Sequence, residues 1–553
     1  MRRKWLKIAL WVLLTPVILF ILLMILLYVP PVQSFIRKQA TAIASDATGM
    51  DISVERIDLR FPLNLLVRGV LVVQPADSAT DVQRPDTLLS LESLNVRVQA
   101  WPLFKGKVEI DDITLKEVSV NSSDLVEGMR IQGTLGRFFL ESHGIDLKNE
   151  DALLNNIELS DTHVQVMLAD TTETPKDSTE TALNWKITLH ALKLKNVSVD
   201  LSMPLDSMRL AAHVGDAEIS EAAADLKHQF YGWKKFLLTG TTVNYDTGNL
   251  NPTDSIAAKP AEGFDASHIA LRDIRLGIDS VMYQGRNMNA VIREFSMNER
   301  SGLSVTSLTG RLLSDSTTIR VPSLKLLTPH SEMNLTAQTY WELINIPTTG
   351  RLTARFNANI GKEDVLLFAG GLPETFKKAY PFRPLVIHAG TEGNLKQMQI
   401  SRFSIDLPGA FSLSGGGEFW NLTDSLNRNG KMDFEMQTQN LNFLTGLTGL
   451  TPDGSIVIPD SMNLAAHFGL EGVQCIADLK LKEGEGLLGL DAAYNLSTEA
   501  YHANLGIDAL QMHHFLPKDS IYTLTANISA KGRGVDIASY KTVAAVKEDR
   551  LRV

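Results

Sequence analysis

Cysteine is nearly absent from the 553-residue chain, because Cys475 is its only one. A single thiol excludes a disulfide within the chain and any zinc site built from several cysteines. Aromatic residues are also few, at 7% against 44% for all hydrophobic residues, so apolar surfaces must consist mainly of aliphatic side chains. Cys475 itself lies in an apolar stretch, where a packed small side chain is the usual role.

An excess of positive charge is lacking as well. Lys and Arg total 53 against 63 Asp and Glu, which leaves a net charge of −10. Proteins that bind nucleic acid draw much of their affinity from neutralising phosphates, so we expect no nucleic-acid partner. The 21% of charged residues argues against a multi-span membrane protein, and the hydrophobic content argues against a disordered chain.

Only one long apolar run occurs. Residues 8–29 contain no charged side chain, and as a helix they would span about 33 Å, close to the thickness of a bilayer core. A signal peptide is the competing interpretation, but its apolar region is shorter and ends at a small-residue cleavage site, whereas Pro30 and Pro31 follow here. We therefore predict that residues 1–30 form a cytoplasmic tip and an uncleaved transmembrane anchor.

The charge beside this run predicts the orientation of the chain. Four basic residues precede it: Arg2, Arg3, Lys4 and Lys7. Positive charge favours the cytoplasmic side of a membrane, so we expect a single-pass protein with a cytoplasmic N-terminus and an extracytoplasmic body.

Residues 31–49 predict a short amphipathic helix. Their apolar members recur at spacings of three and four, Gly49 can end the helix, and polar residues occupy the other face. The apolar members are Val32, Phe35, Ile36, Ala40 and Ile43, and the polar ones are Gln33, Arg37, Lys38, Thr41 and Ser45. Two placements stay open: along a membrane surface, or against the protein's own domain, where the helix would cover the end of a sheet.

From residue 50 to residue 553 the apolar period becomes two, and a spaced pattern recurs. Written h-x-h-x-x-h-x-h, with h apolar, its offsets form no helical stripe at about 100° per residue, so it indicates strands. It occurs at Ile52, Val54, Ile57 and Leu59; at Val108, Ile110, Ile113, Leu115, Val118 and Val120; at Ile187, Leu189, Leu192, Leu194, Val197 and Val199; and at Ile269, Leu271, Ile274 and Leu276.

The two-residue x-x step of this pattern predicts that the sheet is bent. Side chains alternate faces along a strand, so two residues between apolar pairs would flip the second pair unless a bulge or corner absorbs one residue. Regular bulges bend a sheet. We therefore predict a mostly β protein, in which one long, curved antiparallel sheet forms an elongated groove or tube over residues 50–553; the alternative is an ordinary sandwich core with coincidental spacing.

Interruptions of the sheet are expected to be few. Short helices are predicted at 363–369, 373–378 and 440–447, and the polar segments 74–86, 169–181 and 247–263 are predicted to be loops.

Catalytic motifs are missing, and we predict no enzyme and no cofactor. The G-x-G-x-x-G at 484–489 lacks a following helix and predicts a hairpin turn, and Gly415 to Gly417 are likewise interpreted as a link between strand segments. His513 and His514 are expected to be an exposed pair on a strand, too divergent to share a metal. Asp111-Asp112 is interpreted as solvated acids at a corner rather than a general acid/base pair.

Several segments resemble the start of AsmA-like proteins, specifically the TamB family. They are I-x-V-x-x-I-x-L at 52–59, Phe61-Pro62, Leu91-x-x-Leu94-x-Val96-x-Val98 and Trp101-Pro102-Leu103-x-x-Gly106; 301–305 and 323–328 are similar to the Bacteroidetes form. The resemblance implies an inner-membrane anchor and a periplasmic β-groove. Such a groove carries phospholipid between the inner and outer membranes, or supports outer-membrane protein assembly with an Omp85-type (TamA- or BamA-like) partner. Family members usually continue to a C-terminal domain, so we expect this chain to be an N-terminal portion.

A lipid conduit needs an apolar lining rather than a reactive site, since each CH₂ kept from water is worth about 0.8 kcal/mol. We predict that the groove is lined by Ile52, Val54, Ile57, Leu59, Ile110, Ile113, Leu115, Val118, Leu189, Leu192, Leu194, Val197, Ile274 and Leu276. The main rival is an extracytoplasmic structural or adhesion scaffold whose apolar faces form a dry core. A cell-wall hydrolase would need a clustered acid pair or a metal site.

Overall fold

The structure, a computed structural model, describes residues 30–60, 63–74, 87–99, 109–126, 129–146, 149–168, 184–248, 263–448, 454–534 and 541–552. Strands account for 68% of the residues, which confirms that the protein is mostly β. The apolar run 8–29, its four basic neighbours and most of the three polar segments lie outside the described residues. No helix in the described part of the chain combines the length and the apolar character needed to cross a bilayer.

The chain divides into two compact units, for which its composition offered no sign. The first unit comprises residues 1–258 and 266–285, and the second comprises residues 259–265 and 286–553.

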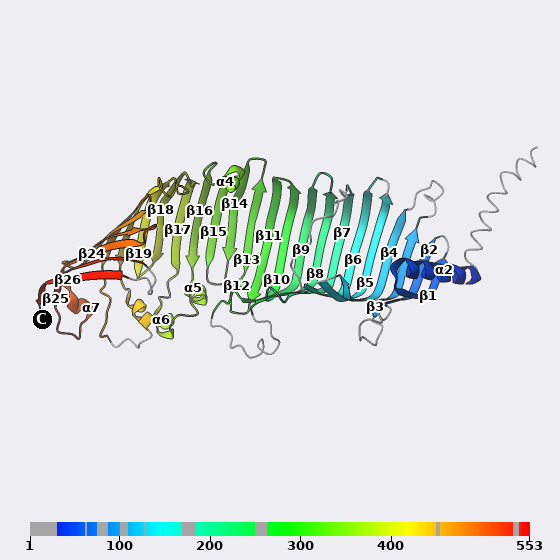
Figure 1. Ribbon diagram of the computed structural model, residues 1–553, viewed down its shortest axis with the longest axis horizontal. Coiled ribbons are helices and arrows are strands. Elements are labelled where there is room, and N and C mark those ends of the chain that lie inside the picture. The colour runs from blue at the N-terminus through cyan, green and yellow to red at the C-terminus, as the bar shows by residue number, and fades with distance from the viewer. Residues whose placement is uncertain are drawn as a thin grey trace, which may run out of the picture. The chain divides into compact units, whose positions relative to one another are not determined.

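In the first unit, helix α2 is followed by ten strands that pair in chain order (Figure 1). The elements are α2 (Pro30–Thr48), β1 (Asp51–Arg60), β2 (Asn64–Val73), β3 (Thr87–Val98), β4 (Ile110–Val126), β5 (Met129–Asp146), β6 (Asp151–Leu168), β7 (Lys186–Met203), β8 (Met208–Asp225), β9 (Phe230–Thr247) and β10 (His268–Gln284).

The predicted antiparallel arrangement is confirmed for all but one of these pairs. Strands β6 and β7 are parallel, with Asp151 opposite Lys186 and Met167 opposite Ser202. Parallel neighbours need a crossover of a dozen or more residues, and the connection 169–185 is long enough to supply it. The exception therefore falls at a long polar insertion, where the apolar pattern gives no information about direction.

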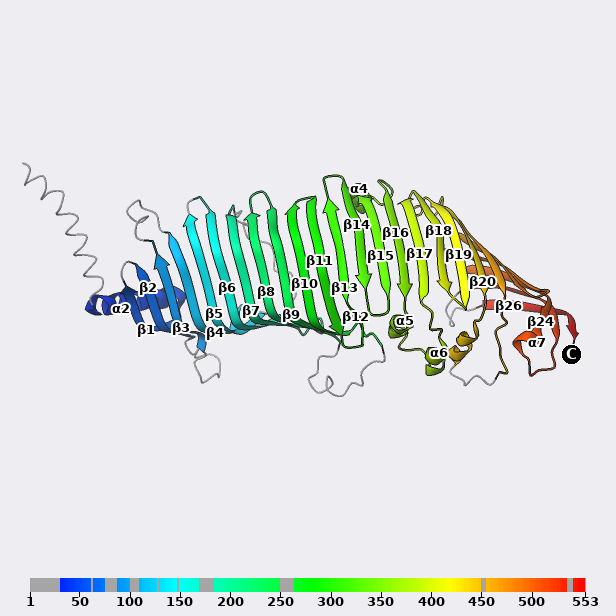
Figure 2. The same cartoon turned by 180° about the vertical axis from the view of Figure 1, so that it is seen from behind.

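The second unit is an antiparallel sheet with short helices beside it (Figure 2). Its strands are β11 (Asn287–Glu299), β12 (Ser304–Val305), β13 (Ser307–Ser314), β14 (Thr318–Leu327), β15 (Glu332–Tyr340), β16 (Leu352–Ile360), β17 (Leu385–Asn394), β18 (Gln397–Leu407), β19 (Phe411–Trp420), β20 (Asn429–Thr438), β21 (Asn463–Glu471), β22 (Gln474–Glu483), β23 (Gly486–Asn495), β24 (Ala500–Gln511), β25 (Thr523–Arg533) and β26 (Lys541–Arg552). Its helices are α4 (Trp341–Asn345), α5 (Lys362–Phe368), α6 (Glu374–Ala379), α7 (Met512–Phe515) and the 3₁₀ helix η1 (Asn442–Thr448).

The three predicted helices are present as α5, α6 and η1, within two residues of the expected starts. Helices α4 and α7 are too short to leave a periodic signal in the sequence. Near α6 and η1 the second unit has a closed hydrophobic cluster, in which Leu407 is only 1% exposed. The buried members of this cluster are Phe376, Tyr380, Leu407, Ala410, Leu441, Phe443 and Met462.

The glycine motifs have different outcomes. Gly484 has φ of 56° and starts the two-residue turn between β22 and β23, which confirms the predicted hairpin. Gly415 to Gly417 lie inside β19, so their interpretation as a link was wrong. A Cβ at residue 415 would come within 2.5 Å of the Asp433 carbonyl oxygen and 2.9 Å of the Phe403 ring. Glycine is therefore needed here to make room for the backbone of the neighbouring strand and an aromatic ring rather than to turn the chain.

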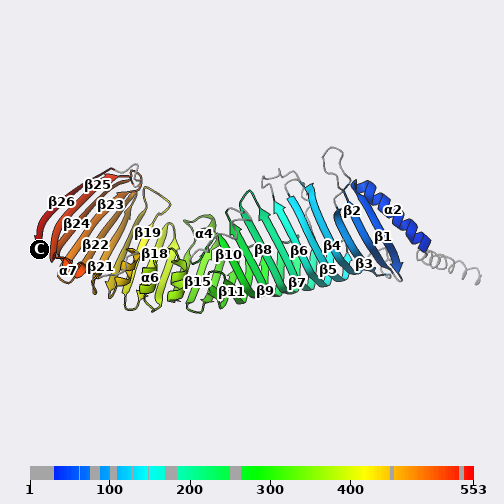
Figure 3. The ribbon, with the colours of Figure 1, turned by 90° about the horizontal axis from the view of Figure 1, so that it is seen from below.

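Helix α2 confirms the prediction for 31–49. The N–H of Gly49 donates to the Ser45 carbonyl at 2.9 Å, and Gly49 has φ of 68°, the usual glycine end of a helix. The helix lies alongside β1 (Figure 3). Of the two placements left open, packing against the sheet edge is therefore present.

Candidate functional site

A row of bulged positions crosses the first unit. In neighbouring strands from β1 to β8, the pairing skips one residue on each strand at the same place, so that Lys116 faces Arg137 and Val118 faces Leu135 while Glu117 and Gly136 have no partner. The skipped residues are Glu55, Gly69, Glu92, Glu117, Gly136, Asp161, Asn196 and Gly215. We call this set the bend row.

The bend row explains the x-x step of the repeat. Glu117, Asp161 and Asn196 have φ of 49°, 51° and 54°, a left-handed conformation that turns the chain without continuing the pleat. One residue of each x-x step is thereby absorbed, and the apolar pairs before and after it stay on one face. Asn196 also donates from Nδ2 to Asp161 Oδ1 at 2.7 Å across the parallel pair.

A second row of skipped positions crosses β6 to β10. It consists of Asn155, His190, Glu221, Lys234 and Ser280. Glu221 and Ser280 again have positive φ, at 51° and 54°. Strands β6, β7 and β8 carry both rows, so the pairing of each is interrupted at two places.

Between and beside the bends, apolar residues of neighbouring strands face one another in continuous rows. Row 1 is Leu59, Leu65, Val96, Ile113, Leu140, Ile157, Leu192, Ile219, Phe236 and Ile278; row 2 is Ile57, Val67, Leu94, Leu115, Phe138, Leu159, Leu194, Ala217, Leu238 and Leu276. Both rows run through all ten strands without an interruption by a polar residue.

Two further rows lie beyond the bend row. Row 3 is Val54, Val70, Leu91, Val118, Leu135, Thr162, Val197 and Val214, and on β9 and β10 it continues with the facing pair Thr241 and Ile274. Row 4 is Ile52, Val72, Leu89, Val120, Gly133, Val164, Val199, Ala212, Val243 and Leu271. We call rows 1 to 4 together the apolar face of the first unit.

The burial pattern shows that the apolar face is sheltered but not sealed. Leu91, Val197 and Ile274, beside the bend row, are buried, whereas most other members, including Leu192 and Leu194, are only half-buried. Side chains on the inner side of a bend converge, which accounts for the deeper burial there. Val199, at 43% exposed, is the main departure from the predicted alternation.

The opposite face of the same strands is charged and exposed. Lys116, Lys193 and Lys195 alternate with apolar residues of rows 1 and 2 and are exposed. Arg137 Nη1 lies 3.9 Å from Glu158 Oε2 across two strands on this face, a surface pair of small energetic worth. The first unit therefore has one apolar face and one solvated face.

The structure brings all of the predicted lining residues into these rows or next to them. Row 1 contains Leu59, Ile113 and Leu192; row 2 contains Ile57, Leu115, Leu194 and Leu276; row 3 contains Val54, Val118, Val197 and Ile274; and row 4 contains Ile52. Ile110 faces Val98, and Leu189 faces Leu154 and Ala222, on the segment beyond row 1. Lipid contact at these residues stays a prediction.

Sequence reasoning missed the members contributed by β2, β5, β6, β8 and β9. In β2 the spaced pattern is present at Leu65, Val67, Val70 and Val72 but was overlooked. In the strands of Phe138 and Ile219, a glycine or alanine occupies some of its apolar positions, as Ala217 does. Only the pairing register shows that these residues continue the rows.

Asp112 corrects one expectation. It is 7% exposed, and its Oδ2 lies 3.0 Å from Arg97 Nε, so it is a buried, paired carboxylate rather than a solvated corner acid. Gln99 Nε2 donates to Asp111 Oδ1 at 2.8 Å. Arg97 faces Asp112 in the pairing of β3 with β4, a register that the linear sequence does not reveal.

The histidine pair also differs from expectation. His513 and His514 lie on α7 rather than on a strand, with ring centroids 4.2 Å apart. His514 Nδ1 lies 2.5 Å from an oxygen of the buried Glu483 carboxylate. Within the described residues, no group of three or more His, Cys, Asp or Glu side chains is arranged to hold a metal ion.

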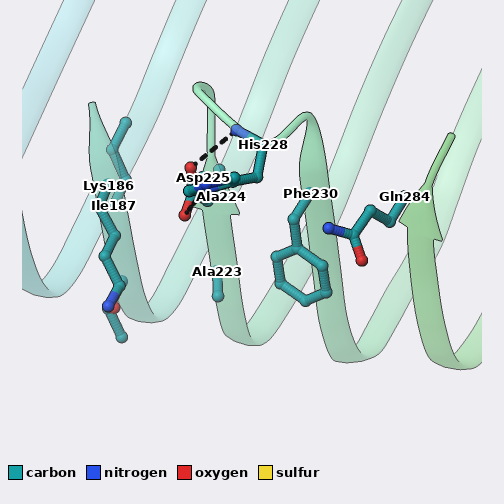
Figure 4. A pocket seen from close by; sticks show the side chains of 9 residues that line it. Lys186, Ile187, Ala223, Ala224, Asp225, His228, Phe230 and Gln284 are labelled. Carbon is teal, nitrogen blue, oxygen red and sulfur yellow. Dashed lines mark hydrogen bonds and ion pairs between the residues drawn. The ribbon is translucent and has the colours of Figure 1, made fainter. Parts of the chain in front are cut away.

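A cavity of about 250 Å³ lies where β7 and β9 begin and β8 and β10 end (Figure 4). Asp225 and His228 face each other there, with His228 Nδ1 2.8 Å from Asp225 Oδ2, and hydrogen bonds from the side chain and backbone of His228 lower the pKa of Asp225. Ile187, Ala224 and Phe230 supply apolar walls. The cavity contains no nucleophile beside a base, so its residues offer no evident catalytic arrangement.

Cys475 is half-buried on β22, where it faces Leu470 and Tyr494. No protein-family model matches the chain, and no curated protein matches it in sequence.

Proposed function

We propose that this protein is an inner-membrane-anchored periplasmic bridge whose apolar β-face carries phospholipid between the inner and outer membranes, in support of outer-membrane biogenesis. The observation that carries the proposal is the apolar face of the first unit: four rows of mainly aliphatic side chains that cross successive strands, most of them half-buried. The TamB resemblance points in the same direction.

The physical argument is one of continuity. An acyl chain leaving a bilayer loses about 0.8 kcal/mol for each CH₂ that water wets. A surface made of Val, Leu and Ile in register offers equivalent contacts at each strand, so a chain can move from strand to strand without crossing a polar barrier. Specific pockets are not required, which is consistent with the low aromatic content.

The membrane assignments rest on the sequence. The uncharged run 8–29 and the basic residues before it support a single anchor with a periplasmic body. An outer-membrane Omp85-type protein as partner, and a role in assembling outer-membrane proteins, rest on the resemblance alone.

The proposal is tested by photo-crosslinking in cells. A crosslinker at Ile113, Leu192 or Leu276 should capture phospholipid, because these half-buried residues lie on the apolar face. Matched controls at Lys116 and Lys195, on the opposite face of β4 and β7, should capture little. Native mass spectrometry of the extracted protein should show bound phospholipid.

Equal capture on both faces would contradict a one-sided groove. Absence of lipid in both measurements would favour the rival function, a structural scaffold in which the apolar face is covered by protein. The closed cluster around Leu407 in the second unit is the observation that favours this rival for that part of the chain.

A further inference from the structure

Helix α2 contacts the sheet through its polar side. Gln33 Nε2 donates to the carbonyl of Leu59 at 3.2 Å, and Arg37 Nη1 donates to the carbonyl of Glu55. The N–H of Ile52 donates to Ser45 Oγ at 3.1 Å. Three side chains spaced along the helix therefore bond to the backbone of β1.

The polar contact between α2 and the sheet is explained by the unpaired edge of β1. Among the described strands β1 pairs with β2 alone, so its other edge offers backbone N–H and C=O groups that need partners. Polar side chains satisfy these groups and apolar ones do not. At these three positions α2 therefore differs from the usual arrangement, in which an amphipathic helix turns its apolar face to the protein.

This arrangement leaves large apolar side chains facing outward. Phe35 is 67% exposed and Ile43 is 60% exposed. At about 100° per residue, Phe35 lies about 150° and Ile43 about 130° from the mean direction of Gln33, Arg37 and Ser45. Exposed pairs of this size on one helix face indicate a contact surface.

The preceding sequence indicates what covers this surface. The 8–29 run ends one residue before Pro30, the first residue of α2. A chain that leaves a bilayer at residue 29 starts α2 at the level of the lipid headgroups. An amphipathic helix at that level lies in the interface with its apolar side chains about 5–10 Å inside.

We propose that Phe35 and Ile43 dip into the bilayer surface while Gln33, Arg37 and Ser45 hold the edge of β1, so that α2 clamps the first strand of the sheet to the membrane. The proposal rests on the membrane anchor of the proposed function but not on lipid transfer. The membrane-proximal end of the apolar face is thereby placed directly against its lipid source.

The test measures the depth of α2 in full-length protein. Single cysteines at Phe35, Ile43 or Ser34 are introduced with Cys475→Ser, labelled with an environment-sensitive fluorophore, and reconstituted into phosphatidylethanolamine and phosphatidylglycerol vesicles that contain brominated lipid. Ser34 is the control because it is exposed and lies about 140° around the helix from the outward face. Labels at 35 and 43 should lose roughly half of their emission by contact quenching at interfacial depth, and the label at 34 should lose little.

Equal quenching at all three positions, or none at 35 and 43 in vesicle-bound protein, would overturn the proposal. It would also fail if the protein did not remain with the vesicles, or if the cysteines at 35 and 43 instead crosslinked two copies of the chain. A crosslinker at Ile113 in the same vesicles reports on the apolar face separately. Quenching at α2 without lipid capture at Ile113 would support the membrane contact of α2 and contradict lipid transfer along the apolar face. Lipid capture at Ile113 without quenching at α2 would support lipid transfer and contradict the membrane contact.

Discussion

The two units of this protein use similar strands but treat their apolar surfaces differently. In the first unit every neighbouring pair from β1 to β10 has skipped residues, and the apolar face is half-buried. In the second unit some pairs, such as β14–β15 and β18–β19, also skip residues, but the five consecutive pairs from β19 to β24 skip none, and α6 and η1 belong to a closed cluster. The bent sheet leaves most of its apolar side chains half-buried, whereas the apolar side chains packed with the helices are fully buried.

The comparison also extends to side-chain size. Rows 1 and 2 of the first unit consist mainly of Leu, Ile and Val, whereas β18 to β20 place glycines against aromatic rings. A Cβ on Gly430 would lie 2.3 Å from the Phe419 ring, and one on Gly415 would lie 2.9 Å from the Phe403 ring. Rings packed on glycines fill space in fixed positions, whereas the aliphatic rows leave a half-buried surface.

The largest effect is expected from a charge in the closed cluster. Leu407→Asp buries an unpaired carboxylate, which costs several kcal/mol, a large part of the roughly 5–15 kcal/mol that stabilises a domain. Thermal unfolding followed by circular dichroism should show a loss of structure far below the parent melting temperature. Unchanged melting would show that the cluster is hydrated and that the two units do not differ in this way.

An intermediate effect is expected at the bend row. Glu117→Val places a β-branched residue at φ of 49°, so this variant should be about 1–2 kcal/mol less stable than Glu117→Gly, which adopts that conformation freely. Denaturant unfolding measures the difference. Lys116→Val, next to the bend but outside the set of positive-φ residues, is the control; if it loses as much stability, the bend is not held by backbone conformation.

The smallest effect on stability is expected on the apolar face itself. Leu194 is half-buried, so water can reach Leu194→Asp, and the free energy of unfolding should fall by only about 1 kcal/mol. Lipid capture by crosslinkers at the row neighbours Leu159 and Ala217 should nevertheless drop sharply. Lys195→Asp should leave both quantities unchanged.

A contrary result at Leu194 would remove the distinction between the units. The contradicting result has two parts: Leu194→Asp melts at a temperature as low as that of Leu407→Asp, and no phospholipid is purified with the parent protein.

Much of the first unit's local structure could be predicted from the pattern of residues. The repeat located β1, β4, β7 and β10, and its x-x step predicted that one residue would be absorbed, as the bend row shows at Glu117 and Asn196. The parallel β6–β7 pair was not predictable, because apolar alternation has no direction. The burial of Asp112 escaped prediction for a related reason: its partner, Arg97, is on another strand.

The orientation of α2 is the clearest example of a property that the sequence pattern could not predict. The spacing of Phe35 and Ile43 predicted an amphipathic helix and left its placement open. The direction of its polar face was decided by the unpaired edge of β1, which exists only after the sheet has formed.

The sequence by itself therefore determined the class of element, the bulge positions and the alternation of apolar and charged faces, because these depend on backbone geometry within a few residues. The tertiary structure decided which residues share a row, where the surface is sealed and which way α2 faces. Those properties depend on register between strands distant in sequence, and hydrogen bonding along an edge has no counterpart in a linear pattern.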